Sequence, residues 1–184
     1  GTNYEYAVAA LSGAGESAFG DAVAIAYAIL EGAPANFSVS ARSGVVELDW
    51  LPPADLGGAE LEGYLVYRSL AAGTPELLAT LSNSTSFFDR TAVAGQTYDY
   101  WVSLAQRAGE GPKAGPRQAT AFAAPSSPLG VEAEGRDGAV TLRWAPPSDT
   151  GGLPISGYAV YRTGPDGVRI LLARLGNLTT ITDG

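Results

Sequence analysis

The chain has 184 residues and a net charge of −8, and it contains neither cysteine nor histidine. The missing cysteine excludes disulfides, thiolate metal sites and a cysteine nucleophile, and the missing histidine removes the commonest general base and metal ligand. Clustered lysine and arginine, which a nucleic-acid or anionic-membrane surface requires, are absent, and no apolar run approaches the roughly 20 residues of a membrane span. We therefore expect no nucleic-acid partner, no membrane-spanning segment and no cofactor.

Residues 1–32 match a later part of the chain when the sequence is shifted by 94 positions. Tyr4 and Tyr6 then fall on Tyr98 and Tyr100, and self-similarity at a fixed period marks a repeated structural unit. The alternating pattern places each tyrosine pair on one face of a β-strand. We predict that residues 1–32 are the last third of one β-sandwich module.

Residues 33–124 have the pattern of a complete module. The runs 45–50, 63–68 and 96–102 are rich in β-branched and aromatic residues, and the first and last alternate between apolar and polar positions. Pro-Pro and Gly-Gly pairs between the runs are turn signals. Short strands with frequent turns over about 94 residues predict a sandwich of about seven strands.

Residues 125–184 repeat the first two thirds of that module. The shift of 94 positions aligns residues 128–184 with residues 34–90 without a gap, and about two-fifths of the aligned pairs are identical. We predict a second, partial module here, which lacks the strands that residues 1–32 represent.

Several motifs together resemble the fibronectin type III module of bacterial and archaeal surface and secreted proteins. They are Gly-x-Val-x-Leu-x-Trp-x-Pro-Pro, Asp-x-Gly-Gly, Gly-Tyr-x-Val-Tyr-Arg and Thr-x-Tyr-x-Tyr-x-Val. The resemblance implies an all-β chain of tandem immunoglobulin-like sandwiches, with strands A, B and E in one sheet and C, C′, F and G in the other. Residues 1–32 would then supply strands F and G, residues 33–124 a complete module, and residues 125–184 strands A to E.

The resemblance also implies roles for aromatic residues that recur at equivalent module positions. A tryptophan in strand B packs in the core, and the hydroxyl of a tyrosine in strand F ties down the E–F loop. Recurrence favours core packing over a carbohydrate-stacking platform. The expected core residues are Trp50, Trp144, Tyr4, Tyr98, Tyr67 and Tyr161.

Two loops with an acidic residue could contribute to a calcium site. The segments 55–58 and 149–152 each offer one carboxylate, whereas calcium takes six to eight oxygen ligands. We expect plain turns there, and solvated turn residues at Glu16 and Glu110. No serine-hydrolase, metal-hydrolase or phosphate-loop pattern is present, so we predict neither a metal site nor an enzyme.

Three Asn-x-Ser/Thr sequons are present, at Asn36, Asn83 and Asn177. Asn83 and Asn177 are equivalent under the 94-residue shift and fall in the predicted turn before strand E. If the source organism glycosylates asparagine, these turns are plausible acceptors for glycans.

The positions at which the sequence starts and ends within the 94-residue repeat suggest a polymer. Residue 184 aligns with Arg90 and residue 1 with Gly95, so four positions would join one copy to the next across an E–F corner. We predict that strands F and G of one copy complete strands A to E of the next, which gives a head-to-tail homopolymer.

The predicted function is thus a structural subunit of an extracellular filament or cell-surface fibre, whose partners are copies of itself. Two alternatives stay open: an adhesin ectodomain, and spacer modules of a secreted polysaccharide-degrading enzyme. The fold by itself does not choose among them.

Overall fold

A computed structural model describes residues 2–27, 32–56, 60–107 and 109–184. Strands are the only regular elements among these residues, which confirms the predicted all-β class. In the same ranges, no helix has the length and apolar character needed to cross a membrane. The chain divides into two compact units: Gly1–Ser40, Val46–Asp89 and Thr97–Ala119 form one, and Ala41–Val45, Arg90–Gln96 and Thr120–Gly184 form the other.

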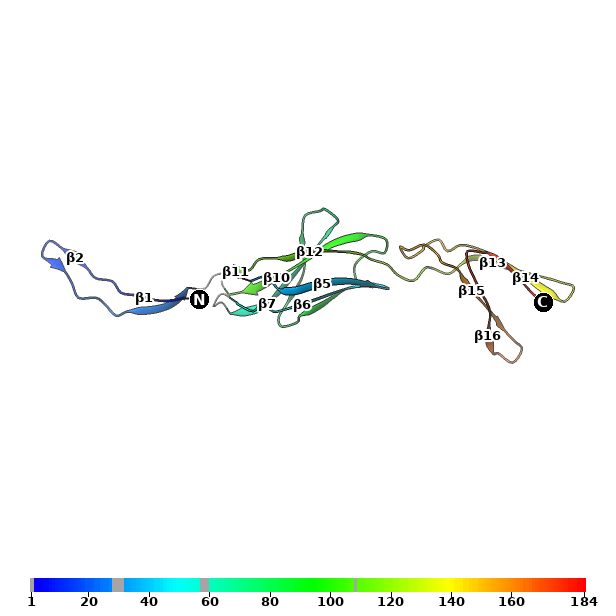
Figure 1. Ribbon diagram of the computed structural model, residues 1–184, viewed down its shortest axis with the longest axis horizontal. Coiled ribbons are helices and arrows are strands. Elements are labelled where there is room, and N and C mark those ends of the chain that lie inside the picture. The colour runs from blue at the N-terminus through cyan, green and yellow to red at the C-terminus, as the bar shows by residue number, and fades with distance from the viewer. Residues whose placement is uncertain (1, 28–31, 57–59, 108) are drawn as a thin grey trace. The chain divides into compact units, whose positions relative to one another are not determined.

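Residues 33–124, called here the middle module, form two antiparallel sheets (Figure 1). One sheet has the order β5-β6-β9, and the other has the order β11-β10-β7-β8 with β12 also paired to β10. The strands are β5 (Ala35–Arg42), β6 (Val45–Leu51), β7 (Leu61–Leu70), β8 (Glu76–Leu81), β9 (Ser86–Asp89), β10 (Thr97–Gln106), β11 (Gly109–Glu110) and β12 (Ala114–Thr120). This order is A-B-E against G-F-C-C′, so the expected fibronectin type III fold is confirmed.

The core of the middle module follows from strand alternation. Val46, Leu48 and Trp50 of β6 are buried, while the intervening residues point outward. The Trp50 ring meets the Tyr64 ring of β7 edge-on, with 5.4 Å between centroids. Apolar faces of both sheets therefore meet in one packed interior, and burial of these faces stabilises the sandwich.

Residues 2–27, called here the N-terminal hairpin, form one long hairpin with two short two-stranded sheets along it (Figure 1). Strand β1 (Thr2–Tyr6) pairs with β4 (Val23–Tyr27), and Tyr4 lies opposite Ile25. Nearer the turn, β2 (Leu11–Ser12) pairs with β3 (Gly15–Glu16).

Residues 125–184, called here the half-module, contain a three-stranded sheet and a two-stranded sheet. The strands are β13 (Leu129–Arg136), β14 (Ala139–Ala145), β15 (Tyr158–Thr163), β16 (Arg169–Leu175) and β17 (Thr180–Asp183). The sheet orders are β13-β14-β17 and β15-β16, equivalent to A-B-E and C-C′. Strand β7 of the middle module lies between two strands, whereas β15 pairs only with β16 in the part of the chain that the structure describes.

Two expected core residues lie on the outside of their sheets. In β7, Tyr64 and Val66 point into the core, so strand alternation turns Tyr67 outward, where it is half-buried. Its equivalent in β15, Tyr161, is 53% exposed. The inward aromatic positions of strand C are therefore Tyr64 and Tyr158, three residues earlier.

Candidate functional site: an open sandwich face and a module junction

The half-module exposes the face that the middle module buries. Leu142, Trp144, Tyr158 and Val160 line an apolar pocket of about 410 Å³, and each has a buried counterpart 94 residues earlier. The difference in exposure between the two modules is large in strand A. Val131 of β13 is 65% exposed, whereas its counterpart Phe37 of β5 is 7% exposed. The pocket is thus lined by the positions that form the interior of the middle module.

The residues of this open face already have the geometry of a finished core. The centroids of Trp144 and Tyr158 are 5.5 Å apart at an interplanar angle of 66°, against 5.4 Å and 62° for Trp50 and Tyr64. The Trp144 amide donates to the Thr179 carbonyl, as the equivalent amide does in the middle module. The two sheets of the half-module are therefore arranged to receive further side chains.

A polar cluster closes one end of the middle module's core. The buried Asp89 carboxylate accepts hydrogen bonds from Arg68 Nη1 at 2.6 Å and from the Tyr100 hydroxyl at 2.9 Å. The Arg68 guanidinium also lies 4.7 Å from the centroid of the buried Tyr98 ring. Burial, together with the hydrogen bond to Asp89, raises the pKa of Tyr100 well above its ordinary value. The hydroxyl therefore stays protonated, and keeps donating, at a pH that ionises an ordinary tyrosine.

The half-module contains only part of this cluster. Arg162 Nη1 donates to Asp183 Oδ2 at 2.8 Å, which repeats the Arg68–Asp89 pair. The half-module supplies no tyrosine to this carboxylate, since the tyrosines of the repeat at these positions belong to strand F. Asp183 and Arg162 are therefore paired as in the middle module, without an equivalent of Tyr100.

The tyrosines of strand F also occur in the N-terminal hairpin. The Tyr4 and Tyr6 centroids are 6.3 Å apart at 44°, close to the 6.2 Å and 51° of Tyr98 and Tyr100. Their surroundings differ, because Tyr6 is 59% exposed and Tyr100 is completely buried. Tyr4, an expected core residue, is also exposed, because nothing in the hairpin itself covers this face.

The segment between the middle module and the half-module is hydrogen-bonded to the loop 149–152. The Ala123 amide donates to the Gly151 carbonyl at 2.8 Å, and the Ser126 amide donates to the Asp149 carbonyl at 2.9 Å. The Asp149 carboxylate accepts the Gly151 amide at 2.8 Å, which closes the loop on itself. Gly57 and Gly58 of the equivalent earlier loop lie outside the described residues.

Two glycines are required by close packing at this junction. Gly151 has φ +70°, and a Cβ there would lie 2.1 Å from the Ala123 carbonyl oxygen. Gly152 has φ +83°, and its Cβ would lie 2.3 Å from the Gly95 nitrogen. Because no side chain fits at either position, the Gly-Gly pair lets loop 149–152 lie directly against the backbone of the connecting segment and the E–F loop.

A charged cluster lies on the outer face of the middle module. The Lys113 ammonium contacts Glu110 at 2.5 Å and lies 4.1 Å from the Tyr67 ring centroid, and the Ser103 hydroxyl donates to Glu110 at 2.7 Å. Burial alone would raise the pKa of Glu110, but the hydrogen bonds from Lys113 and Ser103 outweigh it and lower the pKa. Glu110, expected to be a solvated turn residue, is thus an ionised, paired carboxylate and unsuited to act as a general acid.

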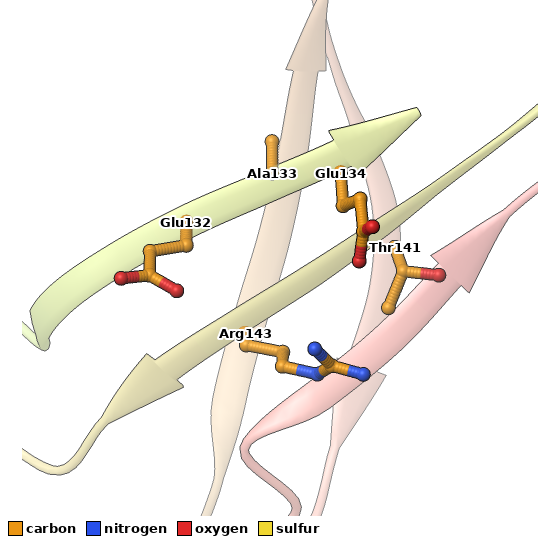
Figure 2. Close-up of a pocket in the computed structure, with 5 residues that line it drawn as sticks. All are labelled: Glu132, Ala133, Glu134, Thr141 and Arg143. Carbon is orange, nitrogen blue, oxygen red and sulfur yellow. The ribbon is translucent and has the colours of Figure 1, made fainter. Parts of the chain in front are cut away.

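A second pocket, of about 400 Å³, lies over β13 and β14 (Figure 2). Glu132, Glu134, Thr141 and Arg143 line it together with Ala133. Glu134 pairs with Arg136, and the Thr141 and Thr182 hydroxyl oxygens are 3.1 Å apart. No group of three or more metal-ligating side chains occurs in the described ranges. The arrangement is a solvated polar sheet face without a nucleophile and base in contact.

The remaining predicted sites fall on the surface. Asn83 is exposed in the turn between β8 and β9, and Asn177 is exposed in the turn between β16 and β17. Asn36 is exposed within β5 and has φ +52°. All three are exposed, and their glycosylation stays a prediction. Trp50 and Tyr98 are buried, Trp144 is half-buried, and the role of Tyr98 at the E–F loop stays a prediction.

Two features escaped the sequence reasoning: the Arg68–Asp89–Tyr100 cluster and the contact of Gly151 with Ala123. A signal for the first was present, because the arginine and the aspartate both recur 94 residues later, as Arg162 and Asp183. Recurrence of a charged pair at core-strand positions indicates a shared contact as readily as recurrence of tryptophan does.

No protein-family model matches the chain. It is 32% identical over 141 residues to Exoglucanase B of Cellulomonas fimi, a match that covers 70% of this chain and 12% of that enzyme. The chain therefore corresponds to a small part of this relative's length. The fibronectin type III fold of the middle module is shown by its own strand order.

Two solved structures match the chain at lower identity. A segment of two fibronectin type III domains from chicken tenascin matches over 82% of this chain and 82% of its own, with 19% identity and a TM-score of 0.47. A Fn3-like protein from Clostridium thermocellum matches over 50% of this chain and 95% of its own, with 22% identity and a TM-score of 0.44.

Proposed function

We propose that this chain, whose middle module has the fibronectin type III fold, is a non-catalytic spacer of a secreted polysaccharide-degrading enzyme. The observation that carries the proposal is the 32% identity to Exoglucanase B over a segment that makes up 12% of that enzyme. A segment of this size leaves most of such an enzyme for other domains. The extracellular location is part of the same proposal.

The chemistry of the described residues supports a non-catalytic role. Glu110, whose pKa is lowered, is paired with Lys113 on an outer face. Asp89 is held by Arg68 and Tyr100 inside the core, where substrate has no access. These charged groups stabilise the sandwich and are not placed to transfer protons to a substrate.

The junction supports a spacer in particular. A connecting segment that is hydrogen-bonded to the following loop, and packed against it through glycines, has fewer accessible conformations than a free linker. Such a segment suits a spacer, which joins other domains without taking part in the reaction.

The proposal is tested on the native protein. Antibodies against residues 33–124 are used to probe the culture supernatant of the producing cells after electrophoresis, beside a glucan zymogram of the same gel. We expect the antibody band and a zone of glucan hydrolysis to coincide at a mass well above 18.8 kDa. An antibody signal confined to inactive, cell-bound material would contradict a spacer in a secreted enzyme.

A second candidate is a structural subunit of an extracellular filament, assembled head to tail by β-strand complementation. One observation favours it: the half-module has an apolar open face and a free edge on β15 in the part of the chain that the structure describes. An exposed strand edge beside an apolar face is a site for strand addition.

A further inference from the structure

We propose that the outer face of the sheet β11-β10-β7-β8 binds a neutral β-linked glucan chain, which stacks on Trp101 and is hydrogen-bonded by the polar side chains on either side of it. The inference deepens and rests on the proposed function, since a polysaccharide is the substrate class of the enzyme to which the spacer would belong. Every residue of the site belongs to the middle module.

A row of apolar side chains crosses this outer face. Trp101 of β10 lies opposite Tyr67 of β7, and Tyr67 lies opposite Leu77 of β8. The strand neighbours Tyr100 and Val66 are buried in the core, so strand alternation turns the row outward. Leu77 is 55% exposed, and both rings are half-buried. The row is therefore an apolar strip on the surface of three adjacent strands.

Trp101 is the ring best placed to stack on a ligand. The Lys113 ammonium lies 4.1 Å from the Tyr67 ring centroid, so a cation already occupies that ring. Beside the indole, β12 contributes Gly115, and a Cβ there would lie 3.1 Å from Trp101 Cδ1. Because the residue is glycine, it adds no side chain over this edge of the indole. The indole can therefore offer its apolar surface to the C–H face of a sugar ring.

Trp101 also stands apart from the internal repeat. The core tryptophans Trp50 and Trp144 recur 94 residues apart, whereas Trp101 falls on Ala7 under the same shift. The repeat thus retains the tryptophan that packs inside the sandwich and does not retain the one that lies outside it. This difference indicates that the indole at position 101 is not required for packing of the module, which leaves a ligand as the reason for it.

A hydrogen-bonding pair lies on each side of the apolar row. Two positions before the indole on β10, the Asp99 carboxylate accepts Gln118 Nε2 at 3.2 Å. Two positions after the indole, the Ser103 hydroxyl donates to Glu110, which also accepts Lys113 Nζ at 2.5 Å. Each pair sets an acceptor beside a donor, and a sugar hydroxyl both donates and accepts. The row with its two pairs therefore matches an apolar ring surrounded by hydroxyl groups.

The hydrogen bonds of Asp99 leave room for a ligand. Its Oδ1 accepts Gln118 and its Oδ2 accepts the Ala72 amide at 2.9 Å, and a carboxylate has about four acceptor sites. Asp99 can therefore accept a further hydrogen bond from a sugar hydroxyl.

The charges around the row favour an uncharged ligand. Two carboxylates, Asp99 and Glu110, outnumber the one ammonium of Lys113, and the whole chain has a net charge of −8. An anionic polymer would be repelled. A β-linked glucan is neutral, and its ring substituents are equatorial. Its axial C–H groups therefore face the indole while its hydroxyls point sideways toward the two pairs.

The test measures binding of cellohexaose, a soluble β-linked glucose hexamer, to the full chain by isothermal titration calorimetry. We expect the wild type to bind, and Trp101→Ala to lower the association constant about tenfold through loss of the stacked ring. Trp101→Phe keeps an aromatic ring and should retain most of the affinity. Gln118→Ala, at an exposed side chain, should weaken binding about threefold. Phe88→Ala removes a 47% exposed ring from the other sheet and is the matched control, which should bind like the wild type.

Urea denaturation of each variant identifies those that fold. A wild type that gives no binding at about 10 mM cellohexaose would overturn the proposal. A folded Trp101→Ala that binds like the wild type would overturn it too, and if this variant does not fold, unchanged binding by Gln118→Ala would do so. Sedimentation equilibrium tests another occupant of this face. A wild-type dimer that Trp101→Ala converts to a monomer would show that a second copy covers the row, and would contradict a glucan site.

The antibody and zymogram experiment separates this inference from the proposed function. Coincident bands without binding of cellohexaose contradict the glucan site and leave the spacer in place. Binding that depends on Trp101, in a protein whose native form is inactive and cell-bound, supports the glucan site and contradicts the spacer.

Discussion

Tyr100 is the residue whose hydroxyl matters most to the middle module's polar core. It donates to the buried Asp89, and a hydrogen bond to a charged group contributes roughly 1.5–3 kcal/mol. We expect Tyr100→Phe to lower the free energy of unfolding by about 2 kcal/mol, measured by urea denaturation. Tyr6→Phe is the control at the equivalent, exposed position, and in dilute solution it should change nothing. Equal effects of the two changes would show that the Asp89 contact is not the cause.

At the scale of elements, the contact between loop 149–152 and the connecting segment depends on Gly151. Alanine at a left-handed position costs about 1–2 kcal/mol by itself, so Gly138→Ala, with φ +82° and no atom within 4 Å of its Cβ, is the control. Gly151→Ala adds a collision with the Ala123 carbonyl. We expect hydrogen exchange of the Ala123 amide to accelerate in Gly151→Ala and to stay slow in Gly138→Ala. The same protection in both variants would contradict a junction built on Gly151.

At the scale of the whole molecule, stability is concentrated in the middle module. In the described ranges, the buried apolar side chains belong to it except Pro147 and Val160. We expect residues 33–124, expressed alone, to unfold cooperatively with a free energy in the usual range of roughly 5–15 kcal/mol. Residues 125–184 alone should show no cooperative transition by circular dichroism, because their apolar face stays open. Loss of cooperativity in the excised middle module would mean that its fold depends on the flanking segments.

Much of the fold could be predicted because the determining signals are local. Alternation in 45–50 identifies which side chains of β6 face the core, and the 94-residue repeat transfers that assignment to β14. The same rule, applied to β7 from Tyr64 and Val66, would have placed Tyr67 and Tyr161 on the outer face. Their placement in the core came from recurrence alone, which marks equivalent positions and does not say which way a side chain points.

The repeat and the strand patterns were sufficient for the all-β class and for the fibronectin type III fold of the middle module. The contacts between residues far apart in the sequence were decided by packing alone. Arg68, Asp89 and Tyr100 meet because three strands from two sheets converge at one end of the core, and Gly151 reaches Ala123 because a loop folds back on its own connecting segment. Distances between residues far apart in sequence depend on how the sheets are stacked, and a local pattern of side chains contains no information about that stacking.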